Sequence, residues 1–214
     1  MTRIALIHAL ADSVAPINAA LARDWPDAQR MNLLDDTLSA DLARAGSLDA
    51  AMFERFQRLA DYVFDAGSDA ILFTCSAFGP CIEAVARRHA ARPVLKPNEA
   101  MLEQAAERGG RVGLVATFAP TLDSMPREFP AGTDLRTVLA EGALAALQAG
   151  DAERHDQLAA RAAERLVGEG CTLIALAQFS LARAAPLVAR RTGLPVLTTV
   201  DSAVRALRRR LELA

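Results

Sequence analysis

Short apolar segments of strand length recur along this chain, and each is followed by a longer stretch with helical periodicity. This alternation constrains the fold more than any other feature, because strands separated by helices form parallel sheets covered by those helices. The segments expected as strands are residues 3–10, 31–34, 70–74, 93–95, 111–117, 135–139, 173–177 and 195–198. Residues 153–168 form an obvious amphipathic helix before the seventh of these strands.

The two halves of the chain resemble each other. Residues 3–7 (RIALI) are similar to residues 111–115 (RVGLV), and residues 93–95 (PVL) recur as residues 195–197. We therefore predict an α/β fold of two similar Rossmann-like halves, each a parallel sheet flanked by helices, with the active site in the cleft between them. The predicted halves are residues 1–97 with 200–214, where the last helix packs back on the first half, and residues 98–199.

Composition excludes several classes of protein. The formal net charge of −2 gives no basic surface for nucleic acid. The apolar run at residues 4–7 is too short for a signal peptide or a membrane span, so a cytoplasmic location and no membrane partner are expected. The three cysteines are odd in number and lack CxxC spacing, which argues against a disulfide framework and against a metal site.

Cys75 is the strongest candidate for chemistry. In a parallel sheet, ligands bind beyond the carboxyl ends of the strands, and Cys75 follows such a strand and precedes a helix expected to begin near Pro80. The N–H groups of a helix start stabilise a thiolate, so its pKa is expected to move toward neutrality. Spacing alone equally allows an inert core cysteine.

The segment Thr74-Cys75-Ser76-Ala77 resembles the first cysteine motif of the aspartate/glutamate/hydantoin racemase superfamily. Residues 111–117 (RVGLVAT) are similar to the strand that opens the other half of those proteins, and the similarity covers essentially the full length. The resemblance implies an enzyme that works at the α-carbon of a small carboxylate with two opposed thiols and with no metal or other cofactor. It also implies that Thr117 helps to hold the substrate carboxylate, and it allows a homodimer.

The second cysteine motif of the family is absent, because the matching segment reads Ala177-Gln178-Phe179. A neutral amide cannot exchange protons near pH 7. Cys75 would then act alone, as it could in a reaction like those of the related arylmalonate decarboxylases and maleate isomerases, and Gln178 becomes a candidate hydrogen-bond donor to a carboxylate or enolate. Racemisation, decarboxylation and cis-trans isomerisation all stay open.

Several other residues complete the predicted substrate-binding set. His8 ends the first strand and could act as an acid or base or bind a carboxylate, although a lone histidine is usually structural. Backbone N–H groups of Ser76 and Ala77 suit a carboxylate at a helix start. Phe179 and Ser180 follow the seventh strand, and the symmetric Phe78 and Phe179 suggest an apolar substituent on the substrate, with core packing as the equal alternative for both.

Two remaining histidines are expected on exposed, charged helix faces, His89 beside Arg88 and His155 beside Arg154. The sequence thus predicts a cofactor-independent isomerase, racemase or decarboxylase that acts on an amino acid, hydantoin or malonate type of carboxylate. The alternative is a protein that binds a small carboxylate in a racemase-like site without turnover. Reactivity of the Cys75 thiol would separate the two.

Overall fold

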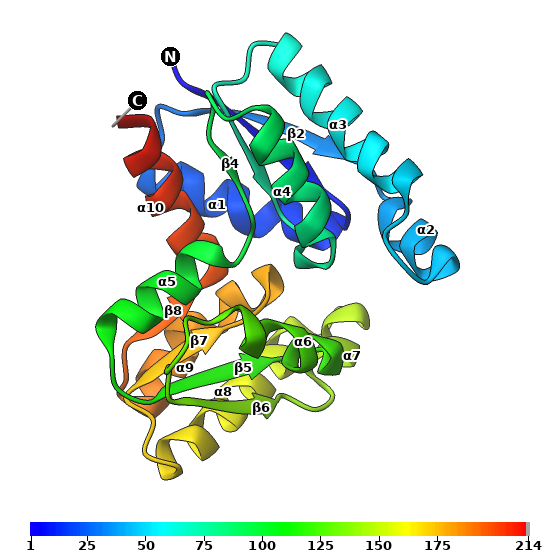
Figure 1. Ribbon diagram of the computed structural model, residues 1–214. Coiled ribbons are helices and arrows are strands. Elements are labelled where there is room, and N and C mark those ends of the chain that lie inside the picture. The colour runs from blue at the N-terminus through cyan, green and yellow to red at the C-terminus, as the bar shows by residue number, and fades with distance from the viewer. Residues whose placement is uncertain (213–214) are drawn as a thin grey trace. The chain divides into compact units, whose positions relative to one another are not determined.

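The computed structural model describes residues 1–212, and these divide into two compact units (Figure 1). The first unit comprises Met1–Pro97 together with the chain from Ala203 onward, and the second comprises Asn98–Ser202. In the described residues, no helix combines the length and the apolar character needed to cross a membrane.

The first unit contains a four-stranded parallel sheet in the order β2-β1-β3-β4. Its strands are β1 (Arg3–His8), β2 (Gln29–Leu34), β3 (Ala70–Phe73) and β4 (Val94–Leu95). Its helices are α1 (Val14–Asp24), α2 (Leu38–Ala45), α3 (Ala50–Asp65) and α4 (Gly79–Arg88), with the 3-10 turns η1 (Ala11–Ser13) and η2 (Ser76–Phe78). Helix α10 (Thr199–Glu212) begins at the end of the second unit and continues into the first.

Helix α3 supplies much of the first core. Asp49 caps it by accepting a hydrogen bond from the Met52 N–H at 2.8 Å, and buried residues then recur at helical spacing along one face. The Phe56 ring lies 5.2 Å from the Phe73 ring of β3 and 5.0 Å from the Phe78 ring, measured between centroids. These aromatic contacts hold α3 against the strand that leads to Cys75.

The second unit repeats this arrangement with the strand order β6-β5-β7-β8, again all parallel. Its strands are β5 (Val112–Ala116), β6 (Leu135–Leu139), β7 (Leu173–Leu176) and β8 (Val196–Thr198). Its helical segments are α5 (Glu99–Arg108), α6 (Ala119–Ser124), η3 (Met125–Glu128), α7 (Ala143–Gln148), α8 (Ala152–Gly168), η4 (Phe179–Ala184) and α9 (Ala185–Thr192).

The predicted fold class is confirmed, because each half is a parallel sheet flanked by helices and the strands follow the same order in both. The main difference lies at the strand ends. The first strand ends at His8 and not at Leu10, because Leu10 already caps the turn η1. The division into two domains, residues 1–97 with 200–214 and residues 98–199, stays a prediction.

The packing of α8 on β5 requires glycine at position 113. A β-carbon at this position would lie 2.8 Å from Leu166 Cδ1 and 3.1 Å from Ile174 Cδ1. Leu166 is fully buried in α8, so it has little room to move. In the first unit, the residue at the matching place in the sequence repeat is Ala5.

We expect Gly113→Ala to lower the free energy of unfolding by about 1–3 kcal/mol, because the added methyl group forces buried side chains out of position. Gly168→Ala is the matched control, since Gly168 is the last residue of α8 and a β-carbon there meets nothing within 4 Å. The control is expected to be neutral or about 0.5–1 kcal/mol more stable. Denaturant unfolding measures both, and equal stability of the two variants would contradict the packing argument.

Candidate active site

Cys75 lies at the carboxyl edge of the first sheet, where sequence predicted it. Strand β3 ends at Phe73, and the Thr74 N–H still donates to the Ile7 carbonyl of β1 at 3.0 Å. Cys75 is extended, with φ −130° and ψ 120°, and it caps the turn η2 that leads into α4. Its side chain is half-buried, whereas Cys81 and Cys171 are buried. Of the three thiols, that of Cys75 is therefore the most accessible to a ligand.

Burial raises the pKa of the Cys75 thiol, and a hydrogen bond from the Ala77 backbone N–H opposes this rise without overcoming it. The expected drop toward neutrality is therefore wrong for the free protein. The N–H group that sequence reasoning invoked is present, but removal of the thiolate from water has the larger effect. Cys75 is a thiol at neutral pH. Burial also raises the pKa of Cys81, to about 11, with the charge of Asp49 as the second cause.

His8 is fully buried at the end of β1 and is hydrogen-bonded at both ring nitrogens. Its Nδ1 lies 2.8 Å from Ser13 Oγ and 3.0 Å from Thr74 Oγ1, and its Nε2 lies 3.1 Å from Asn32 Oδ1. The Asn32 oxygen also accepts from the Asn18 Nδ2 amide at 2.7 Å. Because an amide oxygen only accepts, Nε2 carries the proton and Nδ1 accepts from a hydroxyl.

Burial lowers the pKa of His8, and the hydrogen bond to Asn32 partly offsets this effect. The ring is therefore neutral near pH 7, which removes the charge that binding of a carboxylate would use. Its contacts instead hold Thr74, the residue before Cys75. Sequence reasoning did not single out Thr74, Ser13 or Asn32, although Thr74 stood inside the quoted cysteine motif.

The lowered pKa of His8 predicts how stability depends on pH. The folded pKa lies below the unfolded value of about 6.5, so the stabilisation is present above that pH and is lost as pH falls through the folded pKa. Wild type should lose more unfolding free energy between about pH 7.5 and about pH 5 than His8→Gln, which keeps hydrogen-bonding groups but does not titrate. Identical losses in urea unfolding would show that His8 does not contribute.

In the second unit, Gln178 joins the carboxyl ends of two strands. Its Oε1 accepts from the Thr117 backbone N–H at 3.1 Å, and its Nε2 donates to Thr121 Oγ1 of α6 at 3.0 Å. Gln178 follows β7 and Thr117 follows β5, so the amide bridges these neighbouring strands. The structure thus brings together two of the predicted site residues, and Thr121 is a partner that the sequence did not reveal.

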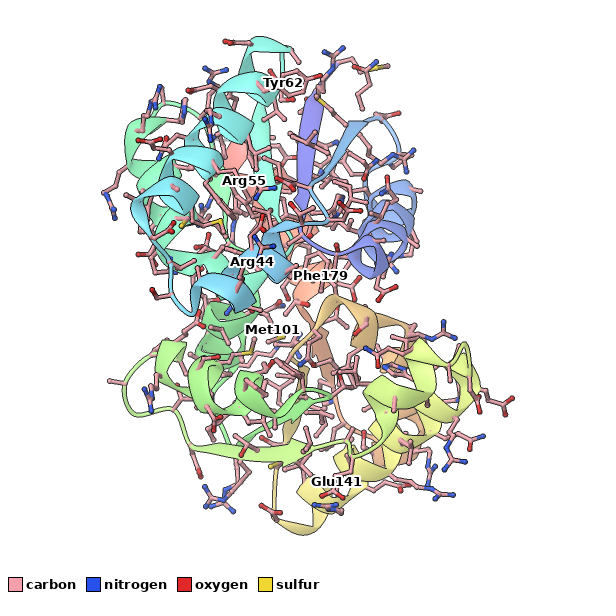
Figure 2. All side chains as sticks on the ribbon, turned by 90° about the vertical axis from the view of Figure 1, so that its right-hand side faces the viewer. Arg44, Arg55, Tyr62, Met101, Glu141 and Phe179 are labelled. Carbon is pink, nitrogen blue, oxygen red and sulfur yellow. The ribbon has the colours of Figure 1, made fainter. Side chains whose placement is uncertain are left out.

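The other predicted site residues lie at the same two sheet edges. In the first unit, Ser76 and Ala77 are exposed at the start of η2. In the second unit, Ser180 is half-buried in η4 and Phe179, labelled in Figure 2, is 6% exposed. Phe78 is 1% exposed and packs on Phe56. Of the two predicted roles for Phe78, contact with substrate or packing in the core, the structure shows packing in the core.

The expectation of exposed histidines is wrong for both residues. His155 is fully buried in α8, where its Nδ1 lies 2.9 Å from Asp156 Oδ1. The His89 side chain is 13% exposed and packs on Phe64, with ring centroids 4.8 Å apart. Both histidines adjoin arginines in sequence, but neighbouring positions on a helix point in different directions, and only the arginine side faces solvent.

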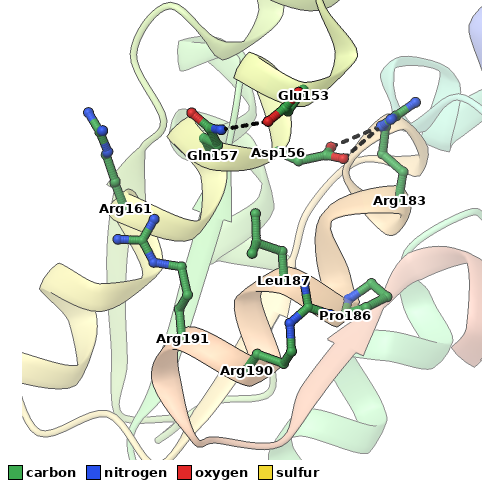
Figure 3. A pocket seen from close by; sticks show the side chains of 9 residues that line it. All are labelled: Glu153, Asp156, Gln157, Arg161, Arg183, Pro186, Leu187, Arg190 and Arg191. Atoms are coloured by element: carbon green, nitrogen blue, oxygen red, sulfur yellow. Dashed lines mark hydrogen bonds and ion pairs between the residues drawn. The ribbon is translucent and has the colours of Figure 1, made fainter.

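A separate hollow of about 580 Å³ lies in the second unit between α8 and α9 (Figure 3). Asp156 is ion-paired with Arg183 there, with 2.9 Å between Oδ1 and Nε. None of the predicted site residues lines this hollow. Within residues 1–212, no group of three or more His, Cys, Asp or Glu side chains is placed to hold a metal ion.

We expect Gln178→Ala to lower the free energy of unfolding by about 1–3 kcal/mol, because it leaves the buried Thr117 N–H without its acceptor. Gln178→Glu keeps an acceptor for this N–H, and the Thr121 hydroxyl can donate to the second oxygen, so this variant should lose less. Thermal and urea unfolding measure both. If Gln178→Ala is as stable as wild type, the bridge does not hold the strand ends.

Comparison with known proteins extends over nearly the whole chain. The family model described as Asp/Glu/Hydantoin racemase matches residues 12–207. A search of curated proteins gave no match.

Solved structures with the same fold include allantoin racemase from Klebsiella pneumoniae, with TM-score 0.72 and 20% identity over 100% of this chain and 89% of that chain. An aspartate racemase homologue from Pyrococcus horikoshii OT3 gives TM-score 0.74 and 13% identity over 99% and 100%. A mutant of arylmalonate decarboxylase gives 0.64 and 19% over 97% and 92%. At these identities, the likeness shows a shared fold.

Proposed function

This chain belongs to the Asp/Glu/Hydantoin racemase family, and from that premise we propose that it is a cofactor-independent enzyme acting at the α-carbon of a small carboxylate through one thiol, that of Cys75. The substrate is of the amino acid, hydantoin or malonate type. The reaction is that of an isomerase or racemase, or of a decarboxylase.

The observation that carries this proposal is the placement of Cys75. It follows the strand β3 at the carboxyl edge of a parallel sheet, is half-buried, and precedes the exposed N-terminal turn of a helical segment. Backbone N–H groups at Ser76 and Ala77 can donate to a substrate carboxylate there. A thiol and an anion-binding turn at one place are what chemistry next to a carboxylate requires.

The raised pKa of Cys75 favours a role in which the thiol donates a proton. In the decarboxylase-like reaction, the bond from the α-carbon to one carboxylate breaks, CO2 leaves, and the electron pair stays on the α-carbon. The Cys75 thiol then protonates this carbanion and regains its proton from water. In the isomerase-like reaction, the Cys75 thiol first gives its proton to water, its thiolate removes the α-proton from one face, and the carbanion takes up a proton from water on the opposite face.

Gln178 enters the proposal as a hydrogen-bond donor and not as an acid. Its Oε1 and one Nε2 hydrogen are used by Thr117 and Thr121, and the second Nε2 hydrogen can donate to a carboxylate or an enolate oxygen. Thr117 stays a proposed carboxylate-binding residue through the family resemblance, and Phe179 and Ser180 stay proposed substrate-binding residues through their position after β7. For His8, the buried hydrogen bonds support a positioning role toward Thr74 and Cys75.

The test is proton NMR in D2O with a panel of amino acids, hydantoins, arylpropionates and substituted malonates. Wild type should exchange the α-proton or release CO2 with at least one of them, and Cys75→Ala should lose the activity by at least about 100-fold. Cys171→Ala is the matched control, since Cys171 is buried and precedes β7 at the opposite sheet edge. Equal activity of Cys75→Ala and wild type would disprove the proposal.

The same experiment addresses the alternative of a protein that binds a small carboxylate without turnover. A protein of that kind would show ligand-dependent protection of Cys75 from iodoacetamide but no exchange or CO2 release with any compound that protects it.

A further inference from the structure

Two leucines stand exposed at the edge of the sheet that carries Cys75. Leu10 is 50% exposed and Leu34 is 44% exposed. Leu34 is the last residue of β2 and pairs in register with His8, while Leu10 lies two residues beyond His8. The strand order β2-β1-β3 and a strand spacing of about 4.8 Å put the backbones of these strand ends within about 10 Å of one another. Single exposed leucines are common, but these two stand at strand ends of the same sheet as Cys75 and add apolar surface there.

The cations of the first unit near this edge are already neutralised. Arg55 of α3 and Arg44 of α2 are labelled in Figure 2. Arg55 forms ion pairs with Asp35 and with Asp41, at 2.6 Å from the latter, and Arg44 lies 3.0 Å from Asp41. Lys96, after β4, lies 2.8 Å from Glu83. A second carboxylate on the substrate would have to compete with these protein carboxylates for a cationic side chain.

The free charges nearest to the two leucines in sequence are acidic. Asp12 lies two residues after Leu10, and Asp36 lies two residues after Leu34; both are exposed. An anionic side chain of a substrate would therefore be repelled at this place, whereas an apolar one would remove leucine surface from water.

We infer, on the basis of the proposed function, that the substrate of Cys75 carries an apolar substituent on its α-carbon, and that Leu10 and Leu34 contact this substituent and set the specificity. Substrates whose side chain ends in a second carboxylate, such as aspartate and glutamate, are then poor. Leucine side chains discriminate by contact area, so truncation of either one should weaken selection of an apolar group by about tenfold.

The first arm of the test compares turnover of phenylglycine and of phenyl-substituted malonate with that of aspartate and glutamate, by proton NMR in D2O. Wild type should favour the phenyl compounds in kcat/KM by at least about tenfold. Leu10→Ala and Leu34→Ala should each reduce kcat/KM for the phenyl compounds about tenfold, mainly through KM. Tyr62→Ala is the control, because Tyr62 is an exposed apolar residue of α3, 58% exposed and well removed in sequence from both leucines.

The second arm needs no turnover. Phenylacetate and succinate are compared for protection of Cys75 from iodoacetamide, with alkylation located by mass spectrometry. They share an acetate group and differ in the substituent, which is phenyl in one and carboxymethyl in the other. Phenylacetate should protect at a concentration at least about tenfold lower than succinate, and Leu34→Ala should remove most of this difference.

The outcomes separate this inference from the proposed function. Cys75-dependent turnover with a preference for aspartate or glutamate would overturn the inference and leave the function standing. Preferential protection by phenylacetate without any turnover would support the inference about the ligand while the function fails. Protection by phenylacetate that is equal to or weaker than that by succinate overturns the inference, whatever the panel shows.

Discussion

The hydrogen bonds among His8, Thr74 and Ser13 are the interactions on which the candidate site depends. They join the carboxyl ends of β1 and β3 inside the protein, where an unpaired polar group would be costly. Ser13 closes the set, because its hydroxyl lies 2.8 Å from Thr74 Oγ1 and donates to the Leu10 carbonyl. Thr74 is thereby held by His8, by Ser13 and by the Ile7 carbonyl. These contacts fix the backbone directly before Cys75.

In the second unit, different residues join the carboxyl ends of the matching strands. The ends of β5 and β7 are joined by the Gln178 amide, which accepts from Thr117. In both units the link connects the first and third strands in chain order, which are neighbours in the sheet. In the first unit, His8 forms the link to Thr74, and Cys75 is the residue after Thr74. In the second unit, Gln178, which matches Cys75 in the sequence repeat, forms the link itself, so most of its hydrogen-bonding groups are used within the protein.

The fold and the family could be predicted from sequence, and the chemical state of the site could not. Strand and helix periods are local, and they identified the strands and the place of Cys75 after β3. The pKa of Cys75 depends on how much water the folded chain removes around it, and no short segment encodes this. Likewise, the rotation of α8 decides that His155 is buried, and the termination of β1 at His8 decides that Leu10 is exposed.

The protonated resting state of Cys75 has a consequence for oxidative damage. Peroxides and disulfides react with thiolates, and a cysteine with a raised pKa presents little thiolate at neutral pH. Both other cysteines are buried and also have raised pKa values, so no ready partner exists for an intramolecular disulfide within the described chain. Peroxide should therefore oxidise Cys75 more slowly at neutral pH than it oxidises a cysteine that rests as a thiolate.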